Sequence, residues 1–129
     1  MKFMKQGKSS TRTLGSQGER LAADYLERNG YRILARSFRT RYGEVDIIAA
    51  DGDIIAFVEV KLRRSSAYGS PGEAIDRRKQ MQIAEVARYF LSSRRFEEVP
   101  CRFDSVLISH HDADDTFSCE LVKDAFRLE

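Results

Sequence analysis

The stretch formed by residues 43–61, GEVDIIAADGDIIAFVEVK, constrains the fold more than any other part of this sequence. Two runs rich in β-branched and aromatic residues flank an Asp-Gly-Asp turn at 51–53, a pattern typical of two antiparallel strands joined by a tight turn. Asp46 interrupts the first run, and Glu59 and Lys61 interrupt the second. A buried ionised carboxylate without a partner is costly. These charges therefore either lie on the surface or gather around a cation.

The length of the turn determines whether the three charges meet. A two-residue loop at 51–52 or at 52–53 pairs odd-numbered with even-numbered residues, so Asp46 and Glu59 share a face of the sheet. They lie directly opposite with the second loop and diagonally with the first. Lys61 joins that face because side chains repeat every second residue. A three-residue loop without a bulge would separate Asp46 from Glu59.

Composition indicates one globular domain. The chain has 129 residues, of which 42% are hydrophobic and 33% charged, enough for a single core and too apolar for a disordered chain. No apolar run approaches the roughly 20 residues of a membrane-spanning helix, and the N-terminus lacks the apolar block of a signal peptide. We therefore expect a cytoplasmic protein. Cys101 and Cys119 lack metal-ligand spacing and are expected to be buried, reduced thiols.

The distribution of basic residues is more informative than the net charge of +2. Residues 1–12 contain four basic residues and no acidic one, which predicts a flexible basic arm ahead of a single domain at 13–129. Other basic residues cluster around the central stretch. Either these side chains are simply solvated, or they contact phosphates. The candidate nucleic-acid-binding residues are Lys5, Lys8, Arg39, Arg41, Arg63, Arg64 and Lys79.

A Ser-x-x-Glu capping box at 16–19 predicts that a helix begins near Ser16, and Asn-Gly at 29–30 is expected to end it. Glu19 lies at the edge of the apolar stripe of this helix. It either only caps the helix or points toward the sheet.

A second capping box at 70–73, with proline at the first helical position, predicts a helix that extends to about residue 92. Lys79 lies on its apolar stripe. Its side chain either extends to solvent or reaches the carboxylates of the central stretch.

The remaining periodicity completes an α/β fold. A strand at 31–38 precedes the central hairpin, whose second strand is expected at 54–62, and further strands are expected at 101–109 and 117–122. The second helix is long enough for a parallel crossover. We predict an αβββαβ core with a mixed central sheet flanked by helices, plus one extra C-terminal strand. The polar segment 110–115, HHDADD, is expected to be a solvated loop rather than a metal site.

The residue types of the central stretch fit magnesium chemistry. Mg²⁺ prefers oxygen ligands and is commonly held by one or two carboxylates, which Asp46 and Glu59 would supply together with the carbonyl of Val60. Lys61 would orient or deprotonate a water on the metal and stabilise negative charge in the transition state. Glu19 would hold a water on the metal if its helix packs across the sheet. The alternative is that Glu-x-Lys forms an exposed cross-strand ion pair.

At this point the sequence resembles known proteins. Residues 43–49, GEVDIIA, followed by VEVK at 58–61, resemble the Asp and Glu-x-Lys core of the PD-(D/E)XK nuclease superfamily, which has the restriction-endonuclease-like fold. Over 15–108 the chain looks like the YraN-like family of small bacterial proteins, and archaeal Holliday junction resolvases are similar in the same core. The motifs that carry the family resemblance are Gly18-Glu19, Ala22-Ala23-x-Tyr25-Leu26, Gly30-Tyr31, the core stretch, Lys79 and Arg102-Phe103-Asp104.

The resemblance implies a metal-dependent DNA endonuclease that uses Mg²⁺ or Mn²⁺ and acts on branched or junction DNA. By position, Asp46 and Glu59 would bind the metal, Lys61 would serve the water, and Glu19 would complete the acidic group. The superfamily's proline before the Asp is replaced here by Val45. The alternative is a catalytically silent nucleic-acid-binding or adaptor module that acts with a DNA-processing partner. By analogy, a homodimer would suit a four-way junction.

Overall fold

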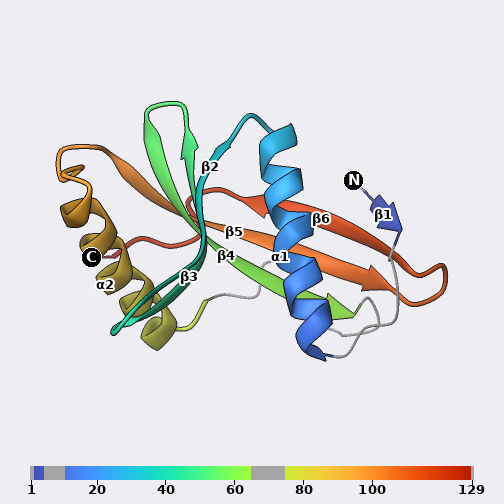
Figure 1. Cartoon of the computed structure of the whole chain (residues 1–129). Coiled ribbons are helices and arrows are strands. Elements are labelled where there is room, and N and C mark those ends of the chain that lie inside the picture. Colours follow the sequence, from blue (N-terminus) through green and yellow to red (C-terminus); the bar gives the residue numbers. More distant parts are fainter. Residues whose placement is uncertain (1, 5–10, 65–74, 129) are drawn as a thin grey trace.

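The computed structural model describes residues 2–4, 11–64 and 75–128. A six-stranded sheet has the strand order β1-β6-β5-β4-β3-β2, in which β4 and β5 are parallel and all other neighbours antiparallel (Figure 1). The predicted αβββαβ core with an extra C-terminal strand is confirmed. In chain order the elements are β1 (Lys2–Met4), α1 (Thr11–Arg28), β2 (Arg32–Thr40), β3 (Gly43–Asp51), β4 (Ile54–Arg64), α2 (Arg77–Ser93), β5 (Cys101–His111) and β6 (Thr116–Val122).

The two helices pack on opposite faces of the sheet. Along β4, Ala56 and Val58 belong to the apolar cluster that contains the buried residues of α1, whereas Ile55 and Phe57 belong to the cluster of α2. Because successive strand residues point to opposite faces, a strand covered on both sides is apolar at nearly every position. This explains the almost continuous apolar run of β4. Neither described helix is long and apolar enough to cross a membrane.

The turn between β3 and β4 is a two-residue loop of Gly52 and Asp53, since Asp51 pairs with Ile54. Gly52 has a φ of 61°, a left-handed conformation that glycine adopts without a steric penalty. Of the two loops considered from the sequence, the structure therefore has the second. Continuing the register of the paired residues places Asp46 directly opposite Glu59.

The N-terminal prediction is wrong in two respects. Within the stretch expected to be a flexible arm, Lys2–Met4 forms β1 and pairs with β6, and α1 already begins at Thr11. Pairing with the edge of the sheet satisfies the backbone groups of β1. Ser16 consequently lies inside α1 and does not cap it. Lys5 and Lys8 lie outside the described residues.

The start of α2 also differs from the prediction. The helix begins at Arg77, and Asp76 is its N-cap, whose side chain accepts a hydrogen bond from the backbone N–H of Lys79 at 2.9 Å. Ile75 is buried but not helical, and the whole motif at 70–73 lies outside the described residues. Asp76, which directly precedes the helix, therefore provides the cap that the sequence motif predicts at Ser70.

The C-terminal half holds smaller corrections. β5 extends through His110 and His111, which were expected in a loop, and His110 lies 2.7 Å from a carboxylate oxygen of Asp115. Both cysteines are free thiols, but only Cys119 is buried. Cys101, at the start of β5, is exposed.

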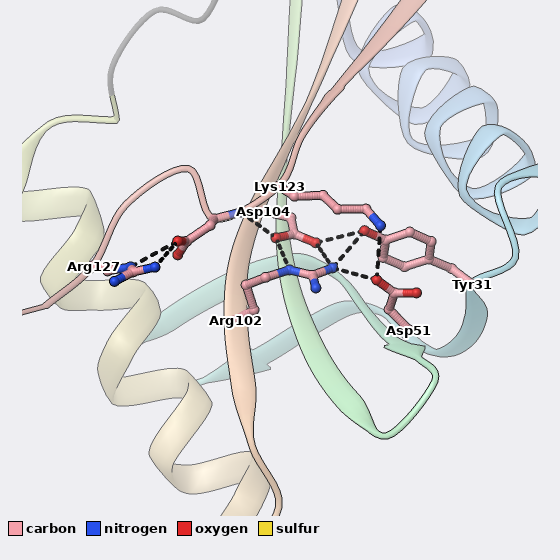
Figure 2. A network of polar contacts seen from close by, with 7 residues as sticks. Tyr31, Asp51, Arg102, Asp104, Lys123 and Arg127 are labelled. Atoms are coloured by element: carbon pink, nitrogen blue, oxygen red, sulfur yellow. Dashed lines mark hydrogen bonds and ion pairs between the residues drawn. The ribbon is translucent and has the colours of Figure 1, made fainter.

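A buried polar network centred on Asp104 joins three parts of the chain at the turn end of the β3–β4 hairpin (Figure 2). Asp104 is fully buried and accepts hydrogen bonds from Tyr31 Oη at 2.9 Å and from Arg102 Nε at 2.7 Å. The Arg102 guanidinium also contacts Asp51 at 2.8 Å, and Lys123 contacts the same Asp51 oxygen at 3.2 Å. Hydrogen bonds from Arg102 and Lys123 lower the pKa of Asp51.

The same network attaches the C-terminal segment to the sheet. The backbone N–H of Asp124 donates to Asp104 at 2.9 Å, and that of Ala125 donates to the carbonyl of Phe103 at 2.7 Å. The ring of Phe126 stacks on that of Phe103 with centroids 4.7 Å apart. Asp104 thus connects Tyr31, just before β2, with the C-terminal segment, and Arg102 links it to Asp51 of the central hairpin.

We predict that Asp104→Ala strongly destabilises the fold. The substitution leaves the Arg102 guanidinium, only 16% exposed, without its main carboxylate. Breaking a buried ion pair in this way costs about 3–5 kcal/mol. Urea unfolding of wild type and variant measures the loss. Glu85→Ala, which removes a surface ion pair with Arg88, is the control and should cost less than about 1 kcal/mol. Equal unfolding midpoints for Asp104→Ala and wild type would contradict the assigned role.

Candidate active site

The candidate site lies where β3 and β4 separate. Their regular pairing ends at Ile47 and Val58, and the next inward backbone N–H, that of Val60, donates to Asp46 Oδ2 at 2.8 Å. A side-chain carboxylate therefore accepts the hydrogen bond that the β3 backbone would otherwise take. In an extended strand, the N–H and C=O of one residue point to the same edge. The carbonyl of Val60 consequently faces the same gap as Asp46.

Glu59 is a partly buried carboxylate with one buried oxygen that accepts no hydrogen bond. Its side chain is 13% exposed, and among the described residues no group donates a hydrogen bond to Oε2. Burial raises the pKa of Glu59 to about 7, and the negative charge of Asp46 adds to this effect. Burial also raises the pKa of Asp46, although the hydrogen bond from Val60 opposes the shift. The two carboxylates thus repel each other when both are ionised, and a cation between them would remove that repulsion.

Two lysines lie beside these carboxylates. Lys79 Nζ is 3.9 Å from Glu59 Oε2, so this side chain reaches from α2 toward the carboxylates rather than extending to solvent. That distance is too long for a hydrogen bond. Lys61 follows Glu59 by two residues on β4, and its charge lowers the pKa of Glu59. The structure therefore brings together Asp46, Glu59, Lys61 and Lys79.

Glu19 approaches the site from α1. Ser37 Oγ lies 2.8 and 2.9 Å from its two carboxylate oxygens, and Arg36 Nε lies 3.6 Å from one of them. Because Glu19 is well inside α1, the interpretation that it only caps the helix is wrong. Burial is the main cause of the raised pKa of Asp46, and the negative charge of Glu19 adds to it. Its contacts with β2 keep Glu19 at the border of the site.

Sequence reasoning missed two residues of this site. Ser37 has a φ of 48°, unusual for a residue other than glycine, and lies at the position of β2 opposite Asp46, where no regular pair forms. A serine in a polar strand gives no sequence signal for this. Glu44 raises the pKa of both Asp46 and Glu59. Its spacing of two from Asp46 could have identified it.

The candidate phosphate-binding residues have different surroundings. Arg39 Nε donates to Glu44 at 3.2 Å, Arg41 donates to Tyr42 Oη at 2.9 Å, and Arg63 Nε donates to Ser109 Oγ at 3.3 Å. Arg39 therefore lies near the carboxylates, whereas Arg41 lies in the turn between β2 and β3. The side chain of Arg64 lies outside the described residues, as do Lys5 and Lys8.

The donor set fits a hard divalent cation. Asp46, Glu59 and the Val60 carbonyl offer only oxygen ligands, and one carboxylate oxygen is buried without a hydrogen bond. No group of three or more His, Cys, Asp or Glu side chains arranged for a metal occurs in the described part of the chain. This set is thus too small for a site built from protein ligands alone. It suits Mg²⁺, which usually keeps several waters and uses one or two carboxylates.

Residues 18–108 match the family described as "Uncharacterised protein family UPF0102". The chain belongs to this family. It is the YraN-like family that the sequence motifs indicate. Relatives named UPF0102 protein occur in Syntrophus aciditrophicus, 48% identical over 88% of each chain, and in Symbiobacterium thermophilum, 45% identical over 90% of this chain and 98% of the relative. The UPF0102 match spans every residue of the candidate site, from Glu19 to Lys79.

We predict that Glu59→Gln changes the pH dependence of stability. Between pH 4.5, the ordinary pKa, and about 7, folded protein keeps a proton on Glu59 that the unfolded chain has released. The free energy of unfolding of the wild type therefore falls as pH rises through this window. The variant lacks this contribution. The free energy of unfolding of Glu59→Gln should therefore rise relative to that of wild type as pH increases to 7.5, by about 3 kcal/mol at most.

Urea unfolding in EDTA at several pH values between 4.5 and 7.5 measures this effect. Glu85→Gln, which removes a carboxylate from the surface of α2, is the matched control and should follow the wild-type curve. Parallel curves for Glu59→Gln and wild type would show that Glu59 does not retain its proton in the folded protein.

Proposed function

We propose that this protein is a metal-dependent DNA endonuclease that hydrolyses phosphodiester bonds and selects branched or junction DNA. The observation that carries the proposal is the buried, unsatisfied Oε2 of Glu59 beside Asp46, at the opening between β3 and β4. A carboxylate pair in this position, with raised pKa values and two nearby lysines, is poorly explained as an exposed ion pair. It is well explained as a cation site.

Each residue of the site would have a separate role in the reaction. Asp46, Glu59 and the Val60 carbonyl would hold Mg²⁺ or Mn²⁺. A divalent ion held there would supply Lewis-acid chemistry, stabilising negative charge on the phosphodiester oxygens. Lys61 would orient the attacking water and stabilise the negative charge that develops on the phosphate oxygens. Glu19, held by Ser37, would position water at the border of the site.

The choice of DNA rests on resemblance. The αβββαβ order and the Asp, Glu-x-Lys pattern at 46 and 59–61 are the features expected of the PD-(D/E)XK superfamily, and similarity to Holliday junction resolvases favours branched DNA. Arg39 and Lys79, which lie beside the carboxylates, and Arg41 and Arg63, which lie elsewhere on β2–β3 and β4, would contact the phosphates. We propose a cytoplasmic protein that acts on DNA during recombination or repair, as a homodimer or with a DNA-processing protein.

A second candidate function is a catalytically silent nucleic-acid-binding or adaptor module. Two contacts favour this function. Lys79 forms an ion pair with Glu59, and the hydroxyl of Ser37 donates a hydrogen bond to the carboxylate of Glu19. In this case the lysine would balance the carboxylate and no metal would be needed. The two functions differ in whether the site binds a divalent cation.

We predict Mg²⁺- or Mn²⁺-dependent cleavage of a four-way junction or flap, with weaker cleavage of plain duplex and single strands. Asp46→Ala, Glu59→Gln and Lys61→Ala should each reduce the rate by about a hundredfold or more, because the first two remove ligands of the metal and the third removes a positive charge beside the phosphate. Glu85→Gln should cleave at the wild-type rate. Gel assays measure cleavage, and isothermal titration calorimetry without DNA measures Mn²⁺ binding, which Asp46→Ala and Glu59→Gln should weaken and Lys61→Ala should preserve.

Two results would contradict the proposal that this protein is a nuclease. Absence of cleavage of every substrate, together with no Mn²⁺ binding, would favour the binding module. Cleavage that survives Glu59→Gln unchanged would place the activity elsewhere on the chain or in a contaminant.

A further inference from the structure

A pocket of about 380 Å³ lies between the β2–β3 turn and α2, and its lining combines cations with aromatic rings. The lining residues are Arg39, Thr40, Arg41, Tyr42 and Tyr89, with no acidic side chain among them. Such a pocket suits a ligand that carries both a negative charge and a flat apolar ring.

The two tyrosines are unusually exposed for aromatic residues held by ordered elements. Tyr42 is 39% exposed and Tyr89 is 52% exposed, and the remaining exposed large hydrophobic side chain of the described residues, Met81, also lies on α2. Two of these three side chains, Tyr42 and Tyr89, line the pocket, whereas Met81 does not. Concentration of exposed apolar surface in one region is a mark of binding sites.

The fold fixes this region firmly. Thr40 pairs with Gly43, so Arg41 and Tyr42 form a two-residue turn between β2 and β3. Gly43 has a φ of 145°, and a Cβ there would meet the side chain of Gln82 from α2 at 3.5 Å, which shows how closely the turn approaches the helix. The ring of Tyr89 lies 6.3 Å from that of Phe38 on β2. The pocket is thus built from elements packed against each other.

The charges are arranged around the rings. The Arg41 guanidinium lies 5.0 Å from the centre of the Tyr42 ring, a cation–π distance, and also donates to its hydroxyl. Arg39 has a highly exposed side chain, 78%, and contacts Glu44. Its guanidinium therefore has room for a phosphate on its solvent side. Aromatic platforms beside cations are the features with which proteins bind single-stranded nucleic acids.

We propose that this pocket binds an unpaired nucleotide of single-stranded or branched DNA, with its base stacked on Tyr42 and Tyr89 and neighbouring phosphates at Arg39 and Arg41. A paired base offers its face only to its neighbours in the duplex, so the pocket discriminates against fully paired DNA. Tyr42 precedes Asp46 by four residues, about 13 Å along β3. The inference rests on the proposed function in one respect: DNA bound in the pocket would need to extend about 13 Å to reach the carboxylates that are proposed to cleave it.

The test separates binding from cleavage. A fluorescein-labelled single strand containing 2-aminopurine is titrated with protein in EDTA, where anisotropy measures affinity and 2-aminopurine quenching reports stacking. Tyr42→Ala and Tyr89→Ala should each weaken single-strand binding about tenfold and reduce the quenching. Tyr89→Phe keeps the ring and should restore both. Met81→Ala, which removes an exposed apolar side chain of α2 outside the pocket lining, is the matched control and should bind like wild type.

The outcomes distinguish this inference from the proposed function. Tyrosine-dependent single-strand binding without cleavage in Mg²⁺ would support the pocket and reject the nuclease. Cleavage of branched DNA by Tyr42→Ala and Tyr89→Ala variants that bind single strands as tightly as wild type would keep the nuclease and overturn the pocket. If Tyr42→Ala and Tyr89→Ala lose as much affinity for fully paired duplex as for single strands, the pocket proposal would also be overturned, because stacking requires an unpaired base.

Discussion

The hydrogen bond from the Val60 N–H to the Asp46 carboxylate is the interaction on which the candidate site depends. It forms where the β3–β4 ladder stops, and it replaces a backbone pair with a side-chain acceptor. A buried N–H without an acceptor would be unfavourable, so the strands can separate here because Asp46 satisfies Val60. The same bond holds Asp46 beside Glu59 and keeps the Val60 carbonyl directed into the gap. One hydrogen bond therefore both permits the opening and arranges its ligands.

The arrangement is electrostatically unfavourable for the two carboxylates. Burial raises the pKa values of Asp46 and Glu59, and Glu44 adds negative charge to both. Lys79 from α2 and Lys61 from β4 offset this only in part, since no hydrogen bond reaches Glu59 Oε2 within the described residues. Ser37 adopts a left-handed backbone conformation opposite Asp46 and contacts Glu19. Unfavourable charge and backbone strain concentrated at one point are typical of functional sites. By contrast, the Asp104 network at the hairpin turn is fully hydrogen-bonded and serves to join the chain end to the sheet.

Local motifs gave the type of most elements but were poor guides to their ends. A tight turn at Gly52 follows from residue chemistry, because glycine adopts a positive φ without penalty, but only the pairing of Asp51 with Ile54 decided that the loop is Gly52-Asp53. The two Ser-x-x-Glu motifs were misleading. Ser16 lies inside α1, and Asp76, not Ser70, caps α2. A capping side chain stabilises a helix start only by about 1 kcal/mol, so packing against the sheet and pairing of Lys2–Met4 with β6 override it. The exposure of Cys101 was also not predicted, because the residues around it in sequence do not show how far β5 extends beyond the core.

The sequence by itself determined the order of helices and strands from α1 to β6 and a tight turn at Gly52, and any two-residue turn there puts Asp46, Glu59 and Lys61 on one face, because side-chain alternation along strands is a local property. Only the tertiary structure decided how the helices complete the site. Glu19 could have been a cap and Lys79 a solvated side chain; packing of α1 and α2 on the sheet brought the first to Ser37 and the second to Glu59. Tertiary structure alone also joined Tyr42 and Tyr89, which are far apart in sequence, into one pocket. Such contacts depend on the relative positions of whole elements, which no local pattern of residues specifies.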